Sequence, residues 1–393
     1  MKVPRLLQGS ILCASSLFLA ACSSPAGVGF SKISLSQQDS RLLTAMLVAE
    51  DQRADSPAGM APLLEGLQSA NADIRRIGVR ALGRLERASL VTSIAPMLAD
   101  PAASVRREAA NALGQAVTGG DPEMASSVLI PRLADEQDPM VRGMIVRTLG
   151  RLPYDSPEQV RAAESALLAA SGAAGAAAAA PDSLSAISPP VAPLDTLLGI
   201  ARGFESLARL QAKEHPLMAP SMALLRALAR YGMPHQDPPR APTADRRQDR
   251  SMKAARIRRL ATSGLIASGH VDSRFLRQAL DDPDQQVRRL AAAAAGTLDL
   301  LDDRRSIVEQ ALADPSAAVR YEALRAYGRR LQADGGCAPT IGALDDPGPH
   351  VALLAIDLLA RGCASAEVSD RLTAIATRLV AGGGAAVGGG DVG

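Results

Sequence analysis

Apolar residues recur along this chain at the three- and four-residue spacing of a helix, and one phrase of such residues returns six times. Each copy has a Leu, a short turn with Asp or Pro, a Val-Arg or Ile-Arg pair, and then Ala and Leu, often closed by Gly. The copies span Leu67–Gly83, Leu98–Gly114, Leu133–Gly150, Leu280–Gly296, Leu312–Gly328 and Leu344–Arg361. Their Val or Ile positions lie 31 and 36 residues apart in the first group of three, and 32 and 32 apart in the second. This period predicts one hairpin of two helices per copy.

The second copy shows why the phrase predicts a hairpin. Asp100-Pro101 interrupts the helix that ends at Leu98, because proline cannot continue a helix. An Asp or Ser before the next helix can cap its free amide groups. That helix has four apolar residues on one face, namely Val105, Ala109, Ala112 and Leu113. We also expect helices to end at the closing glycines Gly114, Gly150 and Gly328, where a left-handed residue costs least.

Each hairpin leaves an apolar face that only another hairpin can cover, so the copies must stack. Composition agrees, because hydrophobic residues are 47% of the chain but aromatic residues only 2%, and Ala and Leu suit closely packed helices. The turn Asp-Pro-x-x-x-Val-Arg resembles the signature of HEAT repeats, in particular the short bacterial HEAT-like repeats of phycobilisome lyases. The match is complete at Asp100–Arg106, Asp282–Arg288 and Asp314–Arg320. We predict an all-α fold, a right-handed α-solenoid of stacked antiparallel hairpins.

The two groups of repeats are separated by a less regular middle. Residues 171–193 are mostly Ala, Gly, Ser and Pro and predict a flexible linker, whereas the cluster of Pro and charge at 234–250 predicts an exposed loop. Helical spacing elsewhere in the middle predicts degenerate repeats, so this region either hinges or presents the face that partners contact. The predicted order is signal peptide 1–21, tether 22–36, HEAT-like repeats 37–170, linker 171–193, degenerate repeats 194–270, HEAT-like repeats 271–380 and a disordered Gly-rich tail 381–393.

An arginine follows the Val or Ile in most copies. As a functional feature, it would bind an anion or a carboxylate of a ligand. As a structural feature, it would pair with a neighbouring Asp or a helix carboxyl end and form a ladder inside the array. We favour the ladder because the residue recurs at one repeat position, at Arg75, Arg106, Arg142, Arg288 and Arg320.

The start of the chain has the layout of an export signal. Lys2 and Arg5 precede an apolar stretch from Leu6 to Ala20 that is shorter than the roughly twenty residues of a membrane-spanning helix. Leu19-Ala20-Ala21-Cys22 resembles the lipobox of bacterial lipoproteins, which implies that Cys22 carries lipid and becomes the first residue. The alternative is an ordinary signal peptide with a coincidental cysteine. Because Ser and not Asp follows Cys22, we expect a lipid-anchored protein of the bacterial cell envelope, at the outer membrane and facing the periplasm.

Two cysteines remain in the body of the chain after export. Cys337 precedes the first helix of the last hairpin and Cys363 follows its second helix, and antiparallel helices bring those ends together. In an oxidising compartment the pair predicts a disulfide. The alternative is two unpaired thiols that behave as small apolar residues.

The sequence contains few residues or motifs that indicate a catalytic or ligand-binding site. Four isolated histidines and the absence of metal-binding, phosphate-binding or nucleophile motifs predict no metal, no cofactor and no enzyme. Without Lys2 and Arg5 the chain has 41 basic and 41 acidic residues, and it has no Trp, so we expect no nucleic-acid partner. Few aromatic residues also weigh against a sugar-binding solenoid.

These features favour a non-catalytic, membrane-anchored scaffold that binds protein partners through its solenoid surface. An alternative comes from the start of the array, which is similar to exported bacterial proteins that place HEAT repeats beside a cyclophilin-type peptidyl-prolyl isomerase domain. That resemblance implies a client-binding, non-catalytic arm of such an isomerase. No isomerase domain is present in these residues.

Overall fold

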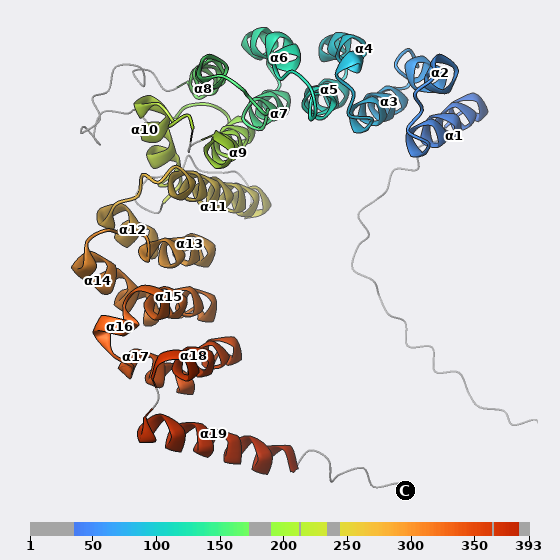
Figure 1. Ribbon diagram of the computed structural model, residues 1–393. Helices are drawn as coiled ribbons and strands as arrows, with labels where there is room; N and C mark the ends of the chain where they lie inside the picture. Colours follow the sequence, from blue (N-terminus) through green and yellow to red (C-terminus); the bar gives the residue numbers. More distant parts are fainter. Residues whose placement is uncertain (1–34, 173–189, 212–213, 234–243, 364, 385–393) are drawn as a thin grey trace, which may run out of the picture.

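The computed structural model describes residues 35–172, 190–211, 214–233, 244–363 and 365–384, and these ranges contain helices and no strand. Successive helices alternate between two rows that follow the chain from end to end (Figure 1). The predicted all-α solenoid of stacked hairpins is therefore confirmed. The predicted signal peptide, Cys22 and most of the predicted linker lie outside the described residues.

Each hairpin contributes one helix to each row. The inner row consists of α1 (Gln37–Asp51), α3 (Ala72–Arg84), α5 (Ala103–Ala116), α7 (Pro139–Leu149), α9 (Leu194–Gln211), α11 (Ala244–Ala267), α13 (Gln285–Ala295), α15 (Ala317–Arg330) and α18 (Pro349–Gly362). The outer row consists of α2 (Pro57–Gly66), α4 (Val91–Ile94) between the short helices η1 (Ala88–Leu90) and η2 (Ala95–Ala99), α6 (Glu123–Asp135), α8 (Pro157–Ala170), α10 (Ala219–Leu228), α12 (Ser273–Leu280), α14 (Leu301–Leu312), and the short α16 (Gln332–Gly335), α17 (Ala338–Gly342) and η3 (Ala343–Asp345). A final helix, α19 (Ala366–Gly384), follows α18.

The solenoid bends at α9 and α11, so that the first and second groups of repeats run in different directions (Figure 1). One buried apolar core continues from Met46 in α1 to Leu265 in α11, and a second begins at Leu276 in α12. The partly buried side chains of Val271 and Phe275 pack against both cores. Apolar burial therefore continues through the bend, as a stack of interdependent repeats requires.

The closing glycines of the repeats do not end helices in a left-handed conformation. Gly114 and Gly328 lie within α5 and α15, and Gly150 follows α7 with a φ of −68°. Glycine is required at these positions because a side chain would clash with the neighbouring helix. A Cβ at Gly114 would lie 2.5 Å from Thr148 Cγ2 of α7, and a Cβ at Gly150 would lie 2.1 Å from the carbonyl oxygen of Gly203 in α9. The repeated glycine lets neighbouring inner-row helices approach each other closely.

The predicted loop and tail also differ from the structure at their edges. Helix α11 begins at Ala244, inside the segment predicted as a loop, because charged residues suit an exposed helix end and Asp249 pairs with Lys253 one turn later at 3.2 Å. Helix α19 continues to Gly384, four residues into the predicted tail, because propagating a formed helix costs less than starting one. Residues 385–393 lie outside the described residues.

We predict that Gly150→Ala destabilises the protein by about 1–3 kcal/mol, because the new methyl group meets the backbone of α9, which cannot move aside as a flexible side chain would. Thermal unfolding followed by circular dichroism measures the effect. Gly119→Ala is the matched control, since nothing lies within 4 Å of a Cβ at that position. Equal stability of the two variants would contradict the close approach of α7 and α9.

Candidate functional site

Five arginines of the inner row each pair with a carboxylate in the turn between the two helices of the following hairpin. The pairs are Arg75 with Asp100, Arg106 with Glu136, Arg258 with Asp282, Arg288 with Asp314, and Arg320 with Asp346. In each pair Nε and Nη2 of the guanidinium donate to the two carboxylate oxygens, at 2.6–3.2 Å. We call these five pairs the arginine ladder. Such bidentate pairs fix orientation as well as distance.

The ladder also organises the turns that it connects. Nη1 of Arg106 donates to the carbonyl oxygen of Asp100, the residue that pairs with Arg75 of the preceding repeat. The same Asp100 carboxylate accepts a hydrogen bond from the amide of Ala102 at 2.8 Å. Arg288 and Arg320 repeat this arrangement with their own turns. Each turn is therefore tied to the repeat before it and to the helix after it.

Glu136 takes the aspartate position in the third repeat, where only one residue separates the proline of the turn from Val141-Arg142. It accepts hydrogen bonds from Arg106, Arg132 and the amide of Asp138, while its side chain is only 1% exposed. Burial alone would raise the pKa of Glu136, but the hydrogen bonds from Arg106, the Asp138 amide and Arg132 outweigh burial and lower the pKa from 4.5 to about 2. The carboxylate is thus held in its charged form.

Two arginines differ from the pattern in the sequence. Arg258 belongs to the ladder although it was not among the predicted positions; the signal that identifies it is Ile257-Arg258 ahead of Asp282-Pro283. Arg142 makes the other predicted pairing, with a helix carboxyl end: it donates to the carbonyl oxygens of Leu133 and Glu136 at the end of α6 and meets no carboxylate among the described residues. The reason is local, because Pro-Val-Ala-Pro at 190–193, just before α9, provides no carboxylate.

The ladder leaves no room for an external anion. Its arginine side chains are 5–15% exposed and its carboxylates 1–9%, and each fork is filled by both oxygens of an internal carboxylate. The ladder therefore holds the register of the repeats and does not bind a ligand.

We predict that Glu136 makes the protein sensitive to acid. Its pKa is lower in the folded chain than the ordinary 4.5, so its contribution to stability is complete above about pH 4.5 and is lost as pH falls toward about 2. Glu136→Gln should cost about 1–3 kcal/mol at pH 7, by weakening the hydrogen bonds from Arg106 and Arg132, and should flatten the loss of stability below pH 4.5. Urea unfolding at a series of pH values checks both, with the exposed neighbour Asp135→Asn as control. The same pH dependence in all three proteins would refute this role for Glu136.

On the exposed side of the inner row, single carboxylates are shared between two arginines. Glu50 pairs with Arg80 and Arg84, Glu205 with Arg202 and Arg209, and Glu322 with Arg289 and Arg325. Each of these three groups carries one more positive than negative charge. The near balance of charge over the whole chain therefore conceals groups of excess positive charge on the inner row.

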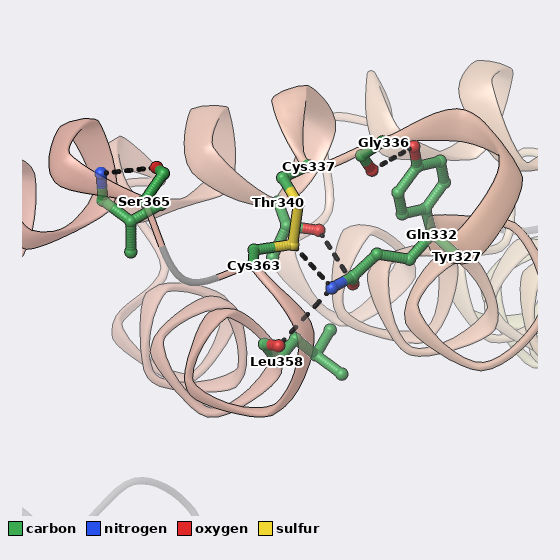
Figure 2. Close-up of a disulfide and its surroundings, with 9 residues drawn as sticks. Tyr327, Gln332, Gly336, Cys337, Thr340, Leu358, Cys363 and Ser365 are labelled. Carbon is green, nitrogen blue, oxygen red and sulfur yellow. Dashed lines mark hydrogen bonds between the residues drawn. A yellow bond between two sulfur atoms is a disulfide. The ribbon is translucent and has the colours of Figure 1, made fainter.

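The last hairpin is closed by a disulfide. Cys337, just before α17, is joined to Cys363, just after α18, as the sequence analysis expects. Cys363 Sγ accepts a hydrogen bond from the side-chain amide of Gln332, which also donates to the carbonyl oxygen of Leu358 (Figure 2). The bond therefore links the short helices α16 and α17 of the outer row to the end of α18.

We predict that reduction of this disulfide weakens the C-terminal hairpin. The bond closes a loop with a sequence separation of 26, which corresponds to about 3 kcal/mol in the chain-entropy model. Hydrogen exchange should show faster opening of residues 338–362 after addition of dithiothreitol, with little change in α3 and α5. A variant with both cysteines replaced by alanine provides the control, because it should exchange quickly with or without reductant. Equal protection before and after reduction of the wild-type protein would rule out a stabilising bond.

The described residues give little support for a metal site or a catalytic site elsewhere. They contain no group of three or more His, Cys, Asp or Glu that is placed to hold a metal ion. Burial raises the pKa of Glu164, but this carboxylate accepts the amide of Met218 at the start of α10 and so has a structural role. No helix within the described ranges has the length and apolar character needed to cross a bilayer.

Comparisons with known proteins agree with the repeat architecture. The family model of HEAT repeats matches residues 60–150, which contain the first three copies of the phrase. Among solved structures 123 chains match. One comes from a structure in which Kap95p binding induces the switch loops of RanGDP to adopt the GTP-bound conformation, with a TM-score of 0.48 and 13% identity over 88% of this chain. The present chain spans 53% of that chain. The comparison with curated proteins gives no match.

Proposed function

We propose that this protein is a non-catalytic scaffold that binds protein partners along the inner row of its solenoid. The observation that supports the proposal is that the arginines of the inner row form two sets, one buried and one exposed. The ladder arginines are buried in pairs that join the repeats, whereas other arginines of α3, α7, α9 and α15 lie on the exposed side of the same row. A row of helices fixed in register offers an extended surface to another protein.

The proposal includes the place where the scaffold acts. The export signal and the lipobox-like Leu19-Ala20-Ala21-Cys22 support a lipid anchor at Cys22 in the bacterial cell envelope, at the outer membrane on its periplasmic side. The Cys337–Cys363 bond is consistent with an oxidising compartment, since disulfides persist there. An anchored solenoid would hold its partners close to the membrane surface.

Crosslinking in intact cells tests this function. We expect the wild-type protein to capture one or a few envelope proteins, identified by mass spectrometry. Cys22→Ser should lose incorporation of a palmitate analogue and lose these partners, whereas Cys13→Ser, which changes a cysteine of the predicted signal peptide, should keep both. Capture of many unfolded secreted proteins instead would favour the client-binding arm of a cyclophilin-type isomerase and would contradict the scaffold.

A further inference from the structure

Three arginines lie on consecutive inner-row helices at the bend of the solenoid. Arg147 comes from α7, Arg202 from α9 and Arg256 from α11, and all three side chains are exposed. We call them the bend cluster. Figure 1 shows these helices side by side where the two arms of the solenoid meet. The bend cluster therefore lies between the two arms of the solenoid.

Backbone contacts hold the helices of the bend cluster together. A Cβ at Gly199 of α9 would lie 2.1 Å from the carbonyl oxygen of Gly143 in α7. Gly150, about two turns after Gly143, likewise meets Gly203, about one turn after Gly199. Arg147 lies between the two contact positions of α7, and Arg202 lies between those of α9. The same register that brings the glycines into contact thus places Arg147 beside Arg202.

Helix α11 is fixed against α9 at both ends of the segment that bears Arg256. Lys253 Nζ lies 3.0 Å from Asp195 Oδ1, and Arg209 Nη2 donates to Ser263 Oγ at 2.7 Å. Arg256 lies between Lys253 and Ser263, while Arg202 lies between Asp195 and Arg209. The two arginines are therefore brought together by contacts on either side of them.

The positive charge of the bend cluster is only partly neutralised. Arg202 shares Glu205 with Arg209, and no carboxylate of the described residues forms an ion pair with Arg147 or Arg256. Partial desolvation of the Arg147 guanidinium by the surrounding helices lowers its pKa, and repulsion from Arg202 and Arg256 lowers it further. Arg151, one turn after Arg147, has a lowered pKa from burial and from Arg147, and its Nε is buried without a hydrogen-bond partner. Like charges held together in this way are stabilised by a bound anion.

We propose that the bend cluster binds an acidic segment of a protein partner, whose carboxylates bridge Arg147, Arg202 and Arg256. This inference rests on the proposed scaffold function and names the chemistry of its partner. In the arginine ladder, each guanidinium pairs with both oxygens of one carboxylate. Peptide carboxylates fit the same fork. A nucleic acid fits less well, because base stacking favours aromatic side chains and the chain has no Trp, four Tyr and four Phe.

Binding of a fluorescent oligoglutamate peptide to the purified chain tests the site. We expect binding that weakens as salt rises through about 0.15 M. The double variant Arg147→Gln with Arg256→Gln should bind at least about tenfold more weakly, because it removes two charge-assisted contacts. It should fold as the wild-type protein does, since it also removes a repulsion, and its melting curve verifies this. Unchanged affinity for the peptide would overturn the proposal.

A matched control removes the same charge from the outer row. Arg161→Gln with Arg274→Gln changes two exposed arginines of α8 and α12 and should alter peptide affinity by less than about twofold. If the control weakens binding as much as the bend variant does, net charge and not the cluster is responsible, and the proposal fails. Inorganic polyphosphate and single-stranded DNA serve as further probes, and binding of either in place of the peptide would also overturn it.

Crosslinking in cells separates failure of this site from failure of the scaffold function. Loss of the captured envelope proteins from the bend variant, with their retention in the outer-row control, supports the site. Retention of the same few proteins in both variants leaves the scaffold function intact and overturns the bend cluster as its contact. Absence of specific partners even with the wild-type protein contradicts the scaffold function itself, whatever the result with oligoglutamate.

Discussion

The bidentate pair between an arginine of one repeat and a carboxylate of the next is the interaction on which the order of this solenoid depends. Apolar burial makes the repeats stack, but it is not directional, and two Ala- and Leu-rich faces can slide past each other at little cost. Arg288 can donate to both oxygens of Asp314 in only one orientation, and Asp314 in turn accepts a hydrogen bond from the amide of Ser316, just ahead of α15. Stacking supplies the stability, and the ladder supplies the register.

The repeat pattern was sufficient to predict the fold because it combines three local signals that agree. Helical spacing of apolar residues, an Asp-Pro turn and a Val-Arg pair all point to the same hairpin, and each signal lies within a few residues. Glu136 could not be recognised in this way. Its repeat also contains Asp138-Pro139, which looks like the usual turn but caps α7 through the amides of Met140 and Val141. Only the three-dimensional register shows that the carboxylate for Arg106 comes two residues earlier.

The glycines show a second limit of local reasoning. Gly114 and Gly150 follow apolar helical positions, where a C-cap is the usual explanation. Their actual partners, Thr148 and Gly203, lie in the next repeats, and the sequence gives no direct indication of contacts between distant helices. The same holds for charge. Net charge describes the chain as a whole, whereas Glu205 and its two arginines lie on one side of one helix, so a balanced composition is compatible with a surface of one sign.

The ladder, the glycine contacts and the uneven distribution of charge all bear on the bend of the solenoid. At α9 the ladder is interrupted, since Arg142 binds the end of α6, and the contact between α7 and α9 depends on paired glycines. Backbone in contact with backbone is less adjustable than a pair of long side chains, so the helices that carry Arg147 and Arg202 are held in place before any partner arrives. Holding like charges together costs free energy in the unbound protein, but a preorganised site loses less entropy on binding than a flexible one. The sequence leaves open whether the irregular middle of the array hinges or presents the face that partners contact. The close contacts of α9 with α7 and α11 support the second alternative, which the proposed site requires.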